Sequence, residues 1–81
     1  MNSLEMNVYS DGRFSHTVST AVLHYDPSTE LSVVECAGLF YVVDCEGDAQ
    51  VRGMMISEAM SNARHAFVVL EFLRVEAEYI A

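Results

Sequence analysis

The sequence contains no lysine and no tryptophan, and its only basic side chains besides histidine are four arginines. Twelve Asp and Glu residues oppose them, which gives a formal net charge of −8 on 81 residues. A field of this sign repels nucleic acid and anionic membranes, and it accelerates association with a basic partner. We therefore expect no direct nucleic acid binding and no membrane binding, and we expect a protein partner with a basic surface.

Cysteines and long apolar runs are also scarce. Two cysteines, Cys36 and Cys45, are too few for the disulfide framework that stabilises small secreted domains. Residues 1–5 have neither a basic segment nor an apolar run, so no signal peptide is predicted. No stretch of about eighteen apolar residues could span a membrane. These features predict a cytoplasmic protein, in the host cell cytoplasm if it is phage-encoded.

The hydrophobic content is 52%, which excludes a disordered acidic tail. Residues 1–81 are predicted to form a single domain. A chain of this size buries only about 60–65% of its unfolded surface. Its core is therefore thin, and an oligomer or a tightly bound partner can complete it.

The N-terminal third has the pattern of a β-hairpin. Residues 4–10 alternate between apolar and polar side chains, and the Asp-Gly pair at 11–12 is a strong turn signal. A two-residue loop would pair Tyr9 with Phe14. A three-residue loop with a glycine bulge would pair Val8 with Phe14 and set apolar residues mostly opposite apolar ones. We predict the three-residue loop, because a register slip of one residue would turn that face to water.

More strands are predicted up to residue 43. The second strand can extend over residues 14–25, and residues 26–29 have the Asp-Pro pattern of a type I turn. A third strand covers 31–35. The Ala-Gly pair at 37–38 indicates a bulge or a tight turn. Residues 39–43 form the most β-prone run of the chain.

The last third is predicted to be helical, because residues 54–81 contain neither glycine nor proline. We expect the helix to begin near Ser57, a suitable N-cap. For residues 66–80 the pattern leaves two alternatives, one continued helix or a final strand. The predicted apolar stripe of the helix comprises Ile56, Ala59, Met60, Ala63, Phe67, Leu70 and Ala77.

Together these elements predict an α+β fold, a small antiparallel sheet of three to four strands with one C-terminal helix packed on a face and a possible final strand. The helix must cover a face because the strands present an apolar side that cannot remain in water.

No catalytic or metal-binding motif is present, so we expect no enzyme, no cofactor and no metal. The acidic segment 44–48 lacks the glycine and glutamate positions of a calcium loop. Cys36 and Cys45 are not spaced as zinc ligands. We expect Cys36 to pack as a small apolar residue and Cys45 to be an exposed thiol. A Cys–His catalytic pair is the third hypothesis.

The leading hypothesis is a non-enzymatic acidic binding protein, an inhibitor that occupies a basic, often nucleic-acid-binding, surface of a protein partner. Carboxylates can meet arginine side chains there, and tyrosines beside them suit such contacts. In size, charge and lack of motifs the chain is similar in kind to phage anti-CRISPR proteins and toxin-immunity proteins, an analogy that rests on these properties alone. The predicted partner-binding residues are Tyr41, Asp44, Glu46, Asp48, Glu71, Glu76, Glu78 and Tyr79.

The alternative is a small structural or assembly subunit that forms a homodimer through a hydrophobic interface. If residues 66–80 are helical, one small sheet cannot cover Val68, Val69, Phe72 and Leu73 together. Some of these side chains would then require a second copy of the chain.

Overall fold

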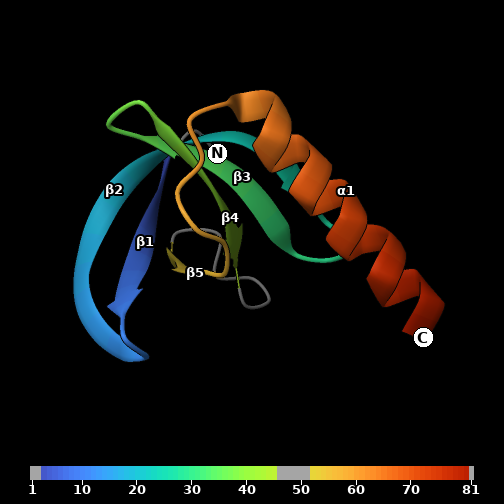
Figure 1. Ribbon diagram of the computed structural model, residues 1–81, viewed down its shortest axis with the longest axis horizontal. Coiled ribbons are helices and arrows are strands. Elements are labelled where there is room, and N and C mark those ends of the chain that lie inside the picture. Colours follow the sequence, from blue (N-terminus) through green and yellow to red (C-terminus); the bar gives the residue numbers. More distant parts are fainter. Residues whose placement is uncertain (1–2, 46–51, 81) are drawn as a thin grey trace.

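Five strands and one helix make up the structure, a computed structural model that describes residues 3–45 and 52–80 (Figure 1). In chain order they are β1 (Ser3–Ser10), β2 (Arg13–Asp26), β3 (Leu31–Cys36), β4 (Leu39–Asp44), β5 (Arg52–Met55) and α1 (Ala63–Ile80).

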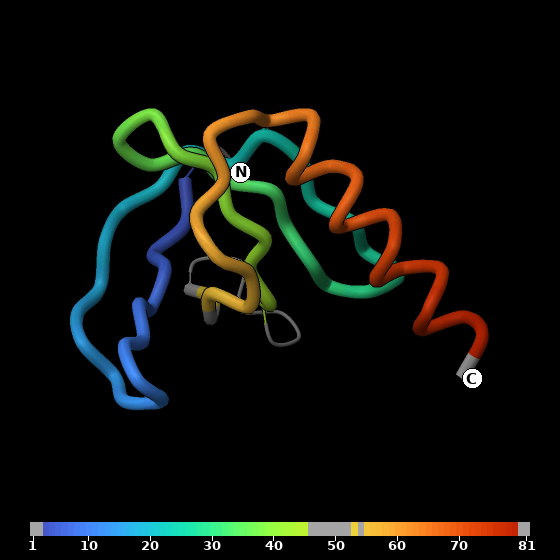
Figure 2. Tube along the Cα trace, in the orientation of Figure 1, coloured from blue at the N-terminus to red at the C-terminus, as the bar shows by residue number. Residues whose placement is uncertain are grey.

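The predicted α+β fold is confirmed. Strands β1 to β4 pair with their sequence neighbours in an antiparallel sheet, and α1 packs against β3 and β4. The short strand β5 was not predicted. It pairs antiparallel with β4 and parallel with β1, so the sheet closes on itself into a small barrel. From β5 the chain returns along β4 before it enters α1 (Figure 2).

The predicted three-residue loop of the first hairpin is wrong. Tyr9 pairs with Phe14, and both loop residues have positive φ, 53° at Asp11 and 76° at Gly12. Two positive φ angles define the type I′ turn, whose twist matches that of the flanking strands. A β-bulge then shifts the register between Val8 and Tyr9. The bulge allows the favoured turn while it keeps the apolar side chains of β1 directed into the barrel.

The turn predicted at 37–38 is a tight turn. Ala37 and Gly38 have φ angles of 54° and 79°, and Cys36 pairs with Leu39 across them. This second type I′ connection leaves β3 and β4 directly adjacent over their full lengths.

The core has two parts, on the two sides of β3 and β4. Side chains alternate along a strand, so Val33 and Val42 face the helix while Val34 and Val43 face the barrel interior. Burial on both faces explains why these strands are runs of apolar residues. The buried residues of the helix side are Leu31, Val33, Val42, Met60, Ala66 and Leu70, and those of the interior are Leu4, Met6, Val34, Val43 and Cys45.

The helix begins later than predicted. The Asn62 side chain accepts a hydrogen bond from the His65 N–H at 3.2 Å, which makes Asn62 the N-cap. The Ser57 hydroxyl instead accepts the Val42 N–H at 2.8 Å. Two backbone hydrogen bonds join Phe40 and Met60, at 2.7 and 2.8 Å. Pairing with β4 therefore holds this segment extended.

Residues 63–80 form one continuous helix, so the alternative of a final strand is wrong. The predicted apolar stripe is correct at Met60 and Leu70, which are buried, but within the helix its phase is displaced because it was counted from residues that precede the helix. Phe67 is 39% exposed and Ala77 is also exposed. The face that packs on the sheet comprises Ala66, Val69, Leu70 and Leu73.

Candidate interaction surfaces

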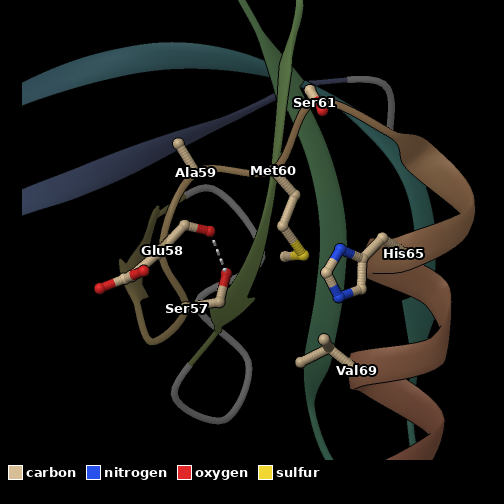
Figure 3. A pocket seen from close by; sticks show the side chains of 7 residues that line it. All are labelled: Ser57, Glu58, Ala59, Met60, Ser61, His65 and Val69. Atoms are coloured by element: carbon tan, nitrogen blue, oxygen red, sulfur yellow. Dashed lines mark hydrogen bonds between the residues drawn. The ribbon is translucent and has the colours of Figure 1, made fainter.

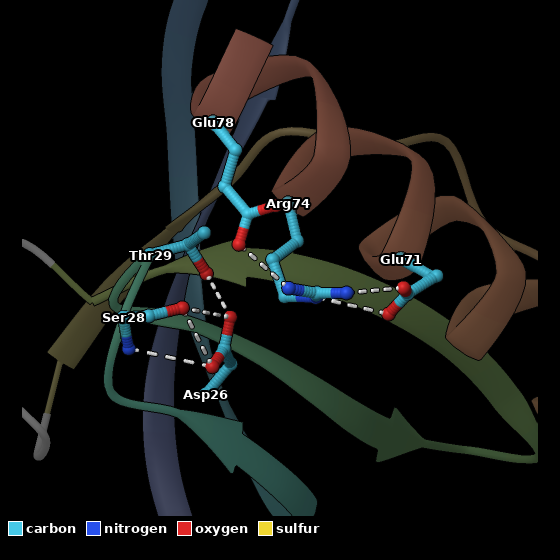
Figure 4. A network of polar contacts seen from close by, with 6 residues as sticks. All are labelled: Asp26, Ser28, Thr29, Glu71, Arg74 and Glu78. Atoms are coloured by element: carbon cyan, nitrogen blue, oxygen red, sulfur yellow. Dashed lines mark hydrogen bonds and ion pairs between the residues drawn. The ribbon is translucent and has the colours of Figure 1, made fainter. Parts of the chain in front are cut away.

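A polar network occupies the C-terminal half of α1 (Figure 4). Arg74 donates to Glu71 at 2.5 and 3.1 Å and to Glu78 at 2.9 Å. The hydrogen bond and charge of Arg74 lower the pKa of Glu71, and both glutamates raise the pKa of Arg74. The three residues carry a net charge of −1, because one guanidinium meets two carboxylates.

The turn between β2 and β3 adds a third carboxylate beside this network. Asp26 accepts hydrogen bonds from the Thr29 hydroxyl at 2.6 Å and from the Ser28 hydroxyl at 3.0 and 3.1 Å. The Thr29 hydrogen bond is the main reason why the pKa of Asp26 is lowered, and the charge of Arg74 contributes. Asp26 therefore remains ionised, with its carboxylate directed toward the Arg74 side of the helix (Figure 4).

Two more carboxylates lie at the same end of the barrel. Asp44 pairs with Leu31 across β3 and β4, and the Glu30 carbonyl accepts the Cys45 N–H at 2.9 Å. We call this group of five residues the acidic end: Asp26, Glu30, Asp44, Glu71 and Glu78.

The predicted partner-binding residues do not form one surface. Glu71 and Glu78 lie on one flank of α1, and Asp44 lies near the Glu30 turn. Glu76 is exposed on the opposite flank of the helix, and Tyr79 is 91% exposed. Tyr41 is half-buried and packs against the interior core cluster. Glu46 and Asp48 lie outside the described residues.

Sequence reasoning missed Asp26, Glu30 and Arg74. The spacing of Glu71, Arg74 and Glu78 places an arginine three and four residues from two glutamates, which is the pattern of ion pairs along a helix. That signal was available. The approach of Asp26 to this helix was not, because it depends on how α1 crosses the sheet.

A second surface is the outward face of α1. Residues at positions 68, 72, 75 and 79 recur every three to four residues and so share one face of the helix. Val68 is 59% exposed, Phe72 66% and Val75 47%. We call this row the outer stripe: Val68, Phe72, Val75 and Tyr79. Several large apolar side chains in one row are unusual on a surface with no function in binding.

An open depression of about 430 Å³ lies between the segment 57–61 and the first half of α1 (Figure 3). The Ser57 hydroxyl, which a serine nucleophile would need free, accepts the Val42 N–H and donates to the Glu58 carbonyl at 3.1 Å. His65 and Val69 line the helical wall. The depression therefore presents a weakly polar surface without an activated nucleophile.

The prediction that Cys45 is an exposed thiol is wrong. Its exposed fraction is 1%, and its sulfur lies 3.2 Å from the Ser32 hydroxyl. Burial raises the pKa of the Cys45 thiol, and the charges of Asp44 and Glu30 raise it further. A neutral, buried thiol is a poor nucleophile. Cys36 is half-buried where β3 ends.

Within the ranges 3–45 and 52–80, no three or more His, Cys, Asp and Glu side chains are arranged to hold a metal ion. No helix in these ranges is both long and apolar enough to cross a membrane. Comparison with protein families, curated proteins and solved structures finds no match for this chain.

Proposed function

We propose that this protein is a non-enzymatic binding protein whose acidic end occupies a basic surface of a protein partner and so blocks that surface. The observation that carries the proposal is the convergence of the Asp26 turn with Glu71 and Glu78 around one arginine. A partner surface rich in arginine can form charge-assisted, bidentate hydrogen bonds with such carboxylates.

The hydrogen bonds and ion pairs within the site support this function. Three hydroxyl contacts and a Ser28 N–H contact hold Asp26, and ion pairs hold both glutamates on α1. Carboxylates that already form hydrogen bonds in the free protein lose less side-chain entropy when a partner binds. An incoming arginine can also replace Arg74 at one glutamate, so the contact does not require an unpaired charge in the free protein.

The proposal applies to basic protein surfaces, including those that otherwise bind nucleic acid. The net charge of −8 favours fast, salt-dependent encounter with them. Such an inhibitor would act in the compartment of its target, for which the cytoplasm, or the host cytoplasm for a phage protein, remains our expectation.

An NMR titration with an oligoarginine peptide tests where this surface lies. We expect amide shift changes at the turn 26–31, at the end of β4 and along one flank of α1, and we expect them to weaken as salt rises. Shift changes confined to the first hairpin, where Glu5 and Asp11 lie, would place the binding surface elsewhere.

Affinity capture from the native host lysate, eluted with a salt gradient, tests the physiological partner. The parent chain should retain a protein that the triple variant Asp26→Asn, Glu71→Gln, Glu78→Gln releases at lower salt. A matched control carries Glu5→Gln, Asp11→Asn and Glu58→Gln, which removes equal charge elsewhere. If both triple variants release the captured protein at equally low salt, net charge alone explains the binding. That result would reject a defined binding site.

A further inference from the structure

The acidic end does not include the outer stripe of α1, although the stripe contains the most exposed large apolar side chains that the structure describes in this helix. The 18-residue helix covers the sheet with one face and presents the stripe on the other. Because the core-facing residues are already buried, the stripe must find a separate partner to leave water.

The charges of α1 indicate what that partner is. No acidic residue occupies the first turn and no basic residue the last. Arg64 lies at the N-terminal end, and Glu76 and Glu78 lie near the C-terminal end. This order opposes the helix dipole, which favours acidic groups at the N-terminus and basic groups at the C-terminus. An isolated helix gains nothing from such an arrangement.

From this geometry we infer that the outer stripe binds a second copy of the chain, with the two α1 helices antiparallel and related by a two-fold axis at Phe72. In this register Phe72 meets Phe72 of the second copy, and Val68 meets Val75. About this axis Val68 and Val75 lie four and three residues from Phe72, so the apolar positions 68, 72 and 75 of the two copies match to within one residue. A two-fold interface requires this kind of self-complementarity.

The same register places opposite charges of the two copies beside each other on both flanks of the helix. In an antiparallel pair, residues on one flank of a helix face the same flank of its partner. Arg64 and Glu78 share one flank, so each Arg64 approaches Glu78 of the other copy. On the second flank, His65 approaches Glu76 of the other copy. A parallel pair would instead bring opposite flanks together and set Glu76 of one copy beside Glu78 of the other.

Near the axis the two Glu71 carboxylates approach one another. Each is paired with Arg74 of its own chain, which offsets part of their repulsion. The antiparallel arrangement also places the positive end of each helix dipole beside the negative end of the other. Apolar contact, flank charges and helix dipoles therefore all favour the same orientation.

Sedimentation equilibrium of the full chain over a wide concentration range tests the dimer. We expect a dimer that Phe72→Asp converts to a monomer with unchanged circular dichroism. The matched control is Phe14→Asp, because Phe14 is 58% exposed on the first hairpin. A parent chain that stays monomeric at every concentration would overturn the inference and assign the stripe to a different partner.

Charge exchange tests the orientation without altering the apolar contact. Glu78→Arg and Arg64→Glu should each weaken the dimer about tenfold, and the double exchange should restore most of the loss. Weakening by the single exchanges without restoration would reject the antiparallel register.

Disulfide cross-linking of cysteine variants, made in a Cys36→Ser background, tests where the two-fold axis lies. Phe72→Cys should form an intermolecular disulfide readily. Val68→Cys should not, because in this register the two copies of position 68 lie about 12 Å apart along the helices. Efficient cross-linking of both variants would indicate a parallel pair and contradict the inference. Phe72→Asp, Phe72→Cys and Val68→Cys leave all five residues of the acidic end unchanged, so in these variants loss of the dimer can be told apart from loss of partner binding.

Discussion

The Cys45 sulfur and the Ser32 hydroxyl lie 3.2 Å apart in the barrel interior, where each has an exposed fraction of 1%. This pair joins the residue that follows β4 to the second residue of β3 and gives each buried polar atom a partner. Because burial is the main reason why the pKa of Cys45 is raised, the thiol stays protonated at neutral pH.

Cys45 should therefore resist alkylation in the native state. At pH 8 we expect iodoacetamide to modify Cys36 first and Cys45 only at the rate of unfolding. Peptide mass spectrometry after timed quenching measures both rates. Equal modification of the two cysteines in the native protein would contradict the burial of Cys45.

The same group makes stability depend on pH in the alkaline range. The native state favours the protonated thiol, so its contribution is complete below the ordinary pKa of 9.0. As the pH rises from 9.0 toward the higher native pKa, the unfolded state loses its proton first. The unfolding free energy should fall by up to roughly 1.4 kcal/mol per pH unit. Urea titrations measure the unfolding free energy across this pH range. The Cys45→Ala variant should lack the part of the decrease that the thiol causes, while the part caused by other groups that titrate at alkaline pH should remain.

The Asp26 turn has the opposite pH dependence. Its lowered pKa means that its contribution is present above 3.8 and is lost as the pH falls through the native pKa. Thr29→Val removes the largest cause and should raise the pKa of Asp26, measured by NMR of the carboxyl carbon. Asp26→Ala should cost about 1 kcal/mol in urea unfolding. A Thr29→Val variant in which the Asp26 pKa is unchanged would exclude this hydrogen bond.

The helix cap can be tested with neighbouring side chains. Asn62→Ala should lower stability by about 1 kcal/mol, because the His65 N–H loses its acceptor. Ser61→Ala, at the exposed preceding position, is the control and should have little effect. Thermal unfolding followed by circular dichroism compares them. A larger loss in the Ser61 variant would show that the helix is capped differently.

Much of this fold follows from local patterns. The alternation in β1, the turn signals at 11–12 and 37–38, and the apolar run of β4 each predict their structure. The first hairpin register failed because the preferred turn and the apolar pairing conflict, and a bulge within the strand resolves that conflict. No local pattern contains this information.

The other features that the sequence did not predict depend on contacts between segments that are distant along the chain. Segment 56–61 has helical composition, yet β4 offers it backbone partners at Phe40 and Val42. Strand β5 is too short to show a pattern and exists because β1 and β4 leave a gap for it. For the same reason, Asp26 joins the candidate site only after α1 has packed across β3.

Gly53 shows how closely β5 fits this gap. A Cβ atom there would collide with the Val43 side chain and press on the Asp44 carbonyl. Gly53→Ala should therefore cost about 1–3 kcal/mol in chemical denaturation. In a double-mutant cycle, Val43→Ala should relieve much of that cost, because it removes the atom in collision. Additive losses would mean that the clash is not the cause.

Substitution of Arg74 should change stability and partner binding in opposite directions. Its ion pairs stabilise α1, while its positive charge offsets part of the negative charge of the acidic end. Arg74→Gln removes both ion pairs on α1 and leaves Asp26, Glu71 and Glu78 uncompensated. Like-charge repulsion should lower the melting temperature, most strongly at low salt. Association with an oligoarginine peptide should become several-fold faster, because the attractive field grows.

Stopped-flow fluorescence and thermal melts measure the two effects. The control, Arg13→Gln on the first hairpin, makes the same charge change away from the acidic end and should accelerate association less. If both variants change the rate equally, only net charge matters. If Arg74→Gln slows association, Arg74 is itself part of the binding surface, and the acidic end does not act as proposed.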